Sequence, residues 1–186
     1  MEAIIVSGMS AVGKTTVSKK VAHKLGLKVV GGGDVLKEMA VEEGYTPGGE
    51  DWWDAKEGMK FLEARKRSSG FDKEVDMRLL EKAKKGNVVI TSYPLPWLSK
   101  QGLKVWLSGG VETRAKRMAK RDHLDEKACR DVLAVRDVEN YKLYKKIYKI
   151  DFGEDLKPFD LLVDTDSIAE SEVARIVLHY VRNRRS

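Results

Sequence analysis

The stretch GMSAVGKT, residues 8–15, decides the fold. It fits the pattern G-x-x-x-x-G-K-[ST], in which glycines let the backbone curl so that its N–H groups face phosphate oxygens. Before it, AIIVS (3–7) predicts a buried strand; after it, KTTVSKKVAHKL (14–25) predicts an amphipathic helix whose N-terminal end favours an anion. A strand, this loop and a helix in that order are the context that a phosphate-binding loop requires.

The loop also predicts the chemistry of its ligand. Lys14 is expected to reach the β and γ phosphates of a nucleotide, and the Thr15 hydroxyl is expected to bind the metal, Mg²⁺. ATP and Mg²⁺ are therefore the predicted cofactors. The predicted nucleotide-binding residues are Gly8, Met9, Ser10, Ala11, Val12, Gly13, Lys14, Thr15 and Thr16.

Strands and helices alternate along the rest of the chain. The apolar patterns predict strands at 3–7, 27–30, 87–91, 103–107 and 160–164, and helices at 14–25, 34–43, 72–85, 111–121, about 125–148 and after 170. This order predicts an α/β fold of the P-loop NTPase type, with a five-stranded parallel sheet flanked by helices. Asp34 is the expected N-cap of its helix, SIAE (167–170) matches a capping box, and residues 92–98 are expected to form a proline-rich turn.

Composition limits the classes of ligand and compartment. The chain has 186 residues and a net charge of +6, from 35 basic and 29 acidic side chains. This basic excess suits an anionic ligand such as a nucleotide, and it permits RNA contact without requiring it. A single cysteine, Cys129, excludes an internal disulfide and indicates a reducing setting.

Targeting signals are not apparent in the sequence. The segment MEAIIVSG (1–8) lacks the basic region and long apolar run of a signal peptide, and no stretch approaches the roughly 18 apolar residues of a membrane span. We therefore expect a cytoplasmic protein without membrane contact. A charged fraction of 34%, with few Asn and Gln, is typical of thermophile proteins.

Taken together, these segments resemble the archaeal-type cytidylate kinases, which are P-loop nucleoside monophosphate kinases. The resemblance covers nearly the whole chain, through GMSAVGKTTVSKKVAHKLGLKVVGGGDVLKEMA (8–40), FDKEVDMRLLEKAKKGNVVI (71–90), LKVWLSGGVETRAKRMAKRD (103–122), YKKIYKIDF (144–152) and FDLLVDTDS (159–167). It implies transfer of the ATP γ-phosphoryl group to a nucleoside monophosphate, with CMP or dCMP as the first candidate, and we expect a monomer.

The resemblance also implies an organisation within one kinase domain, residues 1–186. The core would comprise about 1–33, 86–121 and 150–186, with an acceptor-binding insertion at about 34–85 and a short lid at about 118–140. Positions that match the family's lid arginines are Arg117, expected against adenine, Arg121, expected near the phosphates, and Arg136. With Lys14 they form the predicted catalytic set, since phosphoryl transfer depends on cations around the moving group. The alternative for each arginine is a solvated basic helix face.

The acceptor side departs from the family pattern. Where the family has arginines, this chain has Lys37, Tyr93 and Leu143. Each lost charge-assisted contact to a phosphate costs on the order of 1.5–3 kcal/mol, so replacements or a different acceptor are expected. The predicted substrate-binding residues are Asp34, Lys37, Asp76, Arg78, Ser92 and Tyr93, and the arginines that can compensate are Arg65, Arg67 and Arg78.

Three functions stay open from the sequence. The first is a nucleoside monophosphate kinase, and the second is a kinase on the same scaffold for a small metabolite or RNA. The third is an adenylate-kinase-like ATPase that acts as a ribonucleoprotein assembly factor, favoured only by the basic tail VRNRRS (181–186). Trp52 and Trp53 either stack on a base or pack the insertion onto the core.

Overall fold

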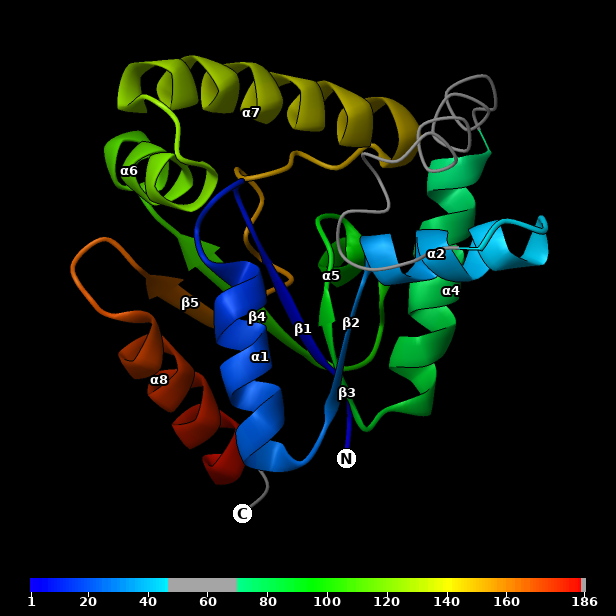
Figure 1. Ribbon diagram of the computed structural model, residues 1–186. Coiled ribbons are helices and arrows are strands. Elements are labelled where there is room, and N and C mark those ends of the chain that lie inside the picture. Colours follow the sequence, from blue (N-terminus) through cyan, green and yellow to red (C-terminus); the bar gives the residue numbers. More distant parts are fainter. Residues whose placement is uncertain (47–69, 185–186) are drawn as a thin grey trace.

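One parallel sheet organises the molecule. In the computed structural model, which describes residues 1–46 and 70–184, five strands lie in the order β2-β3-β1-β4-β5 (Figure 1). Their bounds are β1 Ile4–Gly8, β2 Lys28–Gly31, β3 Val88–Thr91, β4 Leu103–Ser108 and β5 Leu161–Asp164. All neighbouring pairs are parallel. The predicted five-stranded parallel sheet is confirmed, and no strand boundary differs from its prediction by more than one residue.

Helices cover both faces of this sheet. Their bounds are α1 Lys14–Leu25, α2 Gly32–Glu42, α4 Phe71–Lys85, α5 Leu95–Leu98, α6 Val111–Asp122, α7 Glu126–Tyr148 and α8 Glu170–Asn183. Along β1, Ile4 and Val6 pack with α1 and α8, whereas Ile5 packs with α2 and α4. Because side chains alternate between faces, a strand covered on both sides must be apolar throughout.

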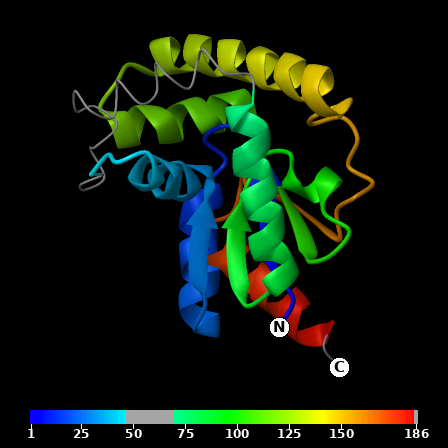
Figure 2. The same cartoon turned by 90° about the vertical axis from the view of Figure 1, so that its right-hand side faces the viewer.

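Two further helices lie beyond the carboxyl ends of the strands. Figure 2 shows α6 and α7 crossing above the sheet, on the side where the loop after β1 emerges. A small cluster that includes Met118, Cys129 and Leu133 packs these helices together. The loop between β1 and α1 therefore lies between the sheet and this helix pair.

An aromatic cluster supports the same end of the sheet. Trp97 and Trp106 meet edge to face, with ring centroids 6.1 Å apart, and Phe152 and Phe159 pack against both. Both tryptophans therefore pack within the core. Trp52, Trp53, Arg65 and Arg67 lie outside the described residues.

Three local predictions were wrong. Helix α2 begins at Gly32, and Asp34 is its third residue, whose carboxylate accepts a hydrogen bond from the Gly31 N–H at 2.7 Å. Helix α8 begins at Glu170 after an uncapped Ala169, so SIAE forms no capping box. The proline-rich turn contains the short helix α5, which the Ser92 hydroxyl stabilises by accepting from the Leu95 N–H. Proline is tolerated there because the first helical turn needs no N–H partner.

Candidate active site

The predicted phosphate-binding loop joins β1 to α1. Gly8 has a φ of +148°, and a Cβ at this position would lie 2.2 Å from the carbonyl oxygen of Leu107 on β4. Only glycine fits where the loop passes this strand so closely. Gly13, with a φ of +95°, precedes α1, and no side chain caps that helix. The backbone N–H groups of the first turn can therefore serve an anion.

Lys14 extends from the first turn of α1 back over the loop. Its Nζ donates to the carbonyl oxygens of Gly8 at 2.9 Å and Met9 at 2.7 Å. Burial of the ammonium, followed by the neighbouring Arg114 guanidinium, lowers the pKa of Lys14 to about 7, and Asp137 opposes this shift. A phosphate beside Nζ would favour the ammonium form, because an opposite charge stabilises the ionised state.

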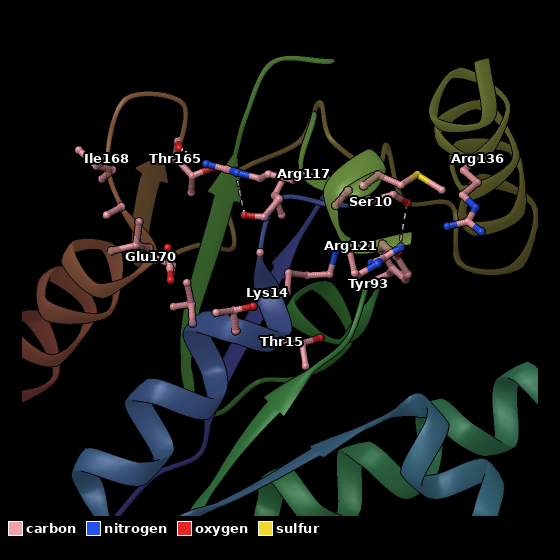
Figure 3. Close-up of a pocket in the computed structure, with 18 residues that line it drawn as sticks. Ser10, Lys14, Thr15, Tyr93, Arg117, Arg121, Arg136, Thr165, Ile168 and Glu170 are labelled. Carbon is pink, nitrogen blue, oxygen red and sulfur yellow. Dashed lines mark hydrogen bonds between the residues drawn. The ribbon is translucent and has the colours of Figure 1, made fainter. Parts of the chain in front are cut away.

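A cavity of about 720 Å³ opens over the loop (Figure 3). Its size lies within the range of small-molecule and cofactor sites. The loop and α1 line one side, and α6, α7 and the segment after β5 line the rest. The lining residues are Ser10–Val17, Tyr93, Arg117, Met118, Arg121, Arg136, Thr165, Ile168, Ala169, Glu170 and Val173. The three predicted lid arginines are thus brought to the same cavity as the loop.

Arg117 lies between the loop and the segment after β5. Its guanidinium donates to the Thr165 Oγ1 at 2.8 Å, to the Thr165 carbonyl, and more weakly to the Val12 carbonyl at 3.4 Å. The part of the cavity wall from Thr165 to Glu170 was not predicted from the sequence. A signal did exist, since residues after β5 must emerge at the same sheet edge as those after β1.

The other two lid arginines are more exposed. Arg121 forms an ion pair with Asp122, the next residue in the chain, with Nε 2.5 Å from Oδ1. This hydrogen bond raises the pKa of Arg121 and lowers the pKa of Asp122. Arg136 projects from α7 on the exposed side of the helix (Figure 3). Both guanidinium groups border the cavity with long side chains that can turn toward a ligand.

A second cavity of about 400 Å³ adjoins the first one. It lies between the ends of β2 and β3, α2, α4 and α7. Its lining residues are Lys14, Thr15, Gly32, Gly33, Leu36, Asp72, Val75, Asp76, Leu79, Thr91, Ser92, Tyr93, Pro94, Leu143 and Tyr144. Lys14, Thr15 and Tyr93 line both cavities. A group held in one cavity therefore meets a group held in the other beside Lys14.

Tyr93 forms part of the partition between the two cavities. Its hydroxyl lies 3.2 Å from the Ser10 Oγ, and its ring centroid lies 4.4 Å from the Lys14 Nζ. The ring also packs on Tyr144 and Phe152, at centroid distances of 6.1 and 5.6 Å. Tyr93 thus holds the ammonium through a cation–π contact and belongs to the aromatic cluster.

Comparison with known proteins decides the family. The model of the cytidylate kinase-like family matches residues 3–167. The chain is 37% identical to a cytidylate kinase of Pyrococcus horikoshii, over 94% of this chain and 85% of that protein. It is 34% identical to a cytidylate kinase of Methanocaldococcus jannaschii, over 97% of both chains.

The chain belongs to the cytidylate kinase-like family. The resemblance inferred from the sequence is therefore confirmed, and the relatives come from thermophilic archaea. A solved shikimate kinase of Acinetobacter baumannii, in complex with shikimate, shares the fold, with a TM-score of 0.58, 19% identity and coverage of 99% of this chain and 94% of that chain. The protein is thus a P-loop kinase by fold and by family.

Within this cytidylate kinase-like chain, the predicted acceptor residues fall into two groups. Asp76, Ser92 and Tyr93 line the second cavity, together with Leu143. Asp76 is buried, and its Oδ2 accepts a hydrogen bond from the Tyr148 hydroxyl at 2.8 Å. This bond joins the end of α7 to α4, so the second cavity and α7 share a contact.

The remaining predicted acceptor residues do not line that cavity in the described structure. Arg78 forms a two-pronged ion pair with Glu42, with both N···O distances at 2.6 Å, and it also binds Glu74 at 2.7 Å. Asp34 serves the start of α2, and Lys37 lies half-buried on the next turn. Arg78 therefore joins α2 to α4, and the phosphate contact expected from the sequence stays a prediction.

Proposed function

We propose that this protein transfers the γ-phosphoryl group of ATP to a nucleoside monophosphate, with CMP or dCMP as the first candidate. The observation that carries the proposal is the pair of adjoining cavities that share Lys14, Thr15 and Tyr93. A donor in the larger cavity and an acceptor in the smaller one would present their phosphates to each other at this junction.

The transfer needs no covalent intermediate on the protein. An acceptor phosphate oxygen attacks the γ-phosphorus while the bond from that phosphorus to the β–γ bridging oxygen breaks, and ADP leaves. Negative charge spreads over the moving group, so its stabilisation depends on positioned cations. Lys14 supplies one at the junction, and we assign Arg117, Arg121 and Arg136 to the donor side because they border the larger cavity.

The residues at the junction fit a magnesium ion. The Thr15 hydroxyl is exposed at the start of α1, and the hydroxyl-bearing Thr91 and Ser92 line the neighbouring wall. Among the described residues no group of three or more His, Cys, Asp or Glu forms a metal cage. Magnesium suits such a site, since it keeps several waters and takes its remaining ligands from phosphates and one or two side chains. Bound there, it would neutralise phosphate charge.

A second candidate is a kinase for a different acceptor. The smaller cavity carries two carboxylates, Asp72 and Asp76, and it has Tyr93 and Leu143 where the family has arginines. Carboxylates repel a phosphate dianion but accept hydrogen bonds from hydroxyl or amino groups. These observations favour an acceptor that presents hydroxyl groups to α4. Ribonucleoprotein assembly, a cytoplasmic location and a monomeric state stay predictions from the sequence.

No helix in the described ranges, 1–46 and 70–184, combines the length and apolar character needed to cross a membrane.

A panel of acceptors tests both candidates. Purified protein is incubated with ATP and Mg²⁺, and ADP release is measured with each common nucleoside monophosphate, with polyhydroxylated metabolites and with RNA. Turnover on CMP or dCMP supports the first candidate, and turnover only on hydroxyl acceptors supports the second. The Lys14→Met variant is the control, because it should abolish transfer to any acceptor. A protein that turns over none of these acceptors would refute both assignments.

A further inference from the structure

Arg114 of α6 is buried against the phosphate-binding loop. Its side chain is 7% exposed, and it does not line the donor cavity. The guanidinium reaches three separate segments. Nε donates to the Gly109 carbonyl at 3.0 Å, Nη1 donates to the Ser10 carbonyl at 3.3 Å, and Nη1 and Nη2 bind Asp137 at 3.2 and 2.8 Å.

We propose that Arg114, held by Asp137 of α7, is a positioning residue that orients the Ser10–Ala11 peptide so that the Ala11 N–H faces the ATP phosphates. This inference rests on the proposed donor role of the loop. It adds a residue that touches neither nucleotide nor acceptor and acts through the backbone of the loop.

The geometry of a peptide unit carries the first step. In a trans peptide the C=O and the following N–H point in opposite directions within one plane. The Ser10 carbonyl accepts from the Arg114 guanidinium, so the Ala11 N–H points away from that guanidinium. Ala11 lines the donor cavity and Arg114 does not, and from this we infer that the N–H is available to phosphate oxygens there.

Backbone conformation at Ala11 shows why an external contact is needed. Ala11 has a φ of +62°, a left-handed conformation that is unfavourable for a residue with a Cβ. A hydrogen bond from a buried guanidinium to the preceding carbonyl stabilises that conformation. Arg117, three residues later on α6, makes a weaker contact of the same kind with the Val12 carbonyl at 3.4 Å. Arginines of α6 therefore donate hydrogen bonds to two carbonyls of the loop, those of Ser10 and Val12.

Asp137 fixes the guanidinium that makes this contact. The ion pair joins α6 to α7, with side chains 7% and 18% exposed. A two-pronged arginine–carboxylate pair constrains the plane of the guanidinium as well as its position. A lysine at position 114 would retain the charge opposite Asp137, but one ammonium cannot reproduce the planar fork that serves three segments.

Binding of two probes, ADP and adenosine, separates positioning of the loop from general damage. In Arg114→Lys we expect ADP to bind about tenfold more weakly. This is the size of effect expected when one hydrogen bond from a charged group, here the bond that orients the Ser10–Ala11 peptide, is lost. Adenosine, which lacks phosphates, should keep its affinity within about twofold. Ligand-observed NMR measures both, since it tolerates weak binding.

The matched control is Arg130→Lys, because Arg130 also joins α7 to α6 through an exposed pair with Glu112 at 2.7 Å but contacts no loop carbonyl. Its ADP affinity should equal that of the wild type. If Arg114→Lys does not fold, Asp137→Asn carries the test, with a selective loss of ADP binding expected. Unchanged ADP affinity, or equal losses for ADP and adenosine, would overturn the positioning role. Wild-type protein that binds no ADP would overturn the proposed donor site itself.

Discussion

Raising the pH above 7 should weaken ADP binding through one group, the ammonium of Lys14. Burial and the neighbouring Arg114 lower the pKa of this lysine to about 7, well below the ordinary lysine value of 10.5. Only the charged form of Lys14 stabilises a phosphate. A nucleotide therefore binds either protein in which Lys14 is already protonated or neutral protein that takes up a proton on binding. As the pH rises, more of the free protein is neutral at Lys14, and more binding events require proton uptake.

The size of the effect follows from the pKa alone. If bound phosphates keep Lys14 protonated, ADP binding should take up about half a proton at pH 7 and about 0.9 proton at pH 8. The dissociation constant should rise about fivefold between pH 7 and 8, and about ninefold between pH 8 and 9. The terminal phosphate of ADP contributes little in this upper range, because its own pKa lies near 6.

Isothermal titration calorimetry in buffers of different ionisation enthalpy measures this proton uptake directly. Lys14→Arg is the control, since a guanidinium stays charged across the range and should take up no proton. Binding enthalpies at pH 8 that do not depend on the buffer would refute the assignment. So would an equal pH dependence of ADP affinity in the wild type and in Lys14→Arg.

The same group should affect stability in the opposite direction. Without nucleotide, the folded protein binds fewer protons at Lys14 than the unfolded chain does between pH 7 and 10.5. The free energy of unfolding should therefore rise with pH in this window through Lys14. The difference in denaturation midpoint between wild type and Lys14→Met, followed from pH 7 to 10, isolates this contribution. A difference that does not change with pH would contradict it.

Three substitutions test other parts of the structure. Gly8→Ala should abolish ADP binding and lower the melting temperature, because its Cβ would lie 2.2 Å from a backbone oxygen of β4; a variant with wild-type binding contradicts this. Tyr148→Phe removes the hydrogen bond to Asp76 and should raise the acceptor KM about fivefold with the ATP KM unchanged, in steady-state kinetics. Arg78→Ala breaks the exposed pair with Glu42 and should cost less than about 1 kcal/mol in chemical denaturation without changing the acceptor KM, whereas a raised KM would return Arg78 to the acceptor site.

The sheet could be predicted from sequence because its signals are local and consistent. Each strand is a short apolar run, and the loop GMSAVGKT fixes where the first strand ends and the first helix begins. Parallel strands then bring distant segments to one edge. The expectation that the lid arginines lie near the loop came from the family resemblance and from no local pattern. The predicted start of α2 failed because three glycines precede Asp34, and glycine is a poor helix former. The Asp34 carboxylate stabilises that turn from inside the helix.

Arg114 could not be separated from its basic neighbours by composition. The run 111–121 has basic residues at five positions, and only the helical phase tells which of them faces the core. Arg114 lies one turn before Met118 and beside Ala115, and all three are buried. Its partner Asp137 lies 23 positions away on another helix. The Arg114–Asp137 ion pair depends on how α6 packs against α7, and no local sequence pattern predicts that packing.

The departure from the family pattern at Tyr93, on the acceptor side, is linked to the charges around Lys14. Tyr93 stands where the family resemblance implies an arginine, and its ring centroid lies 4.4 Å from the Lys14 Nζ. An arginine there would add a second cation beside a lysine whose pKa Arg114 already lowers. Like charges disfavour ionisation, so Lys14 would lose its proton more readily unless a phosphate lay between the cations. Tyrosine avoids that repulsion and keeps a cation–π contact, at the cost of a phosphate contact on the acceptor side. If the acceptor binds in the second cavity as proposed, groups other than residue 93 must hold its phosphate, and the choice of acceptor depends on that cavity as a whole.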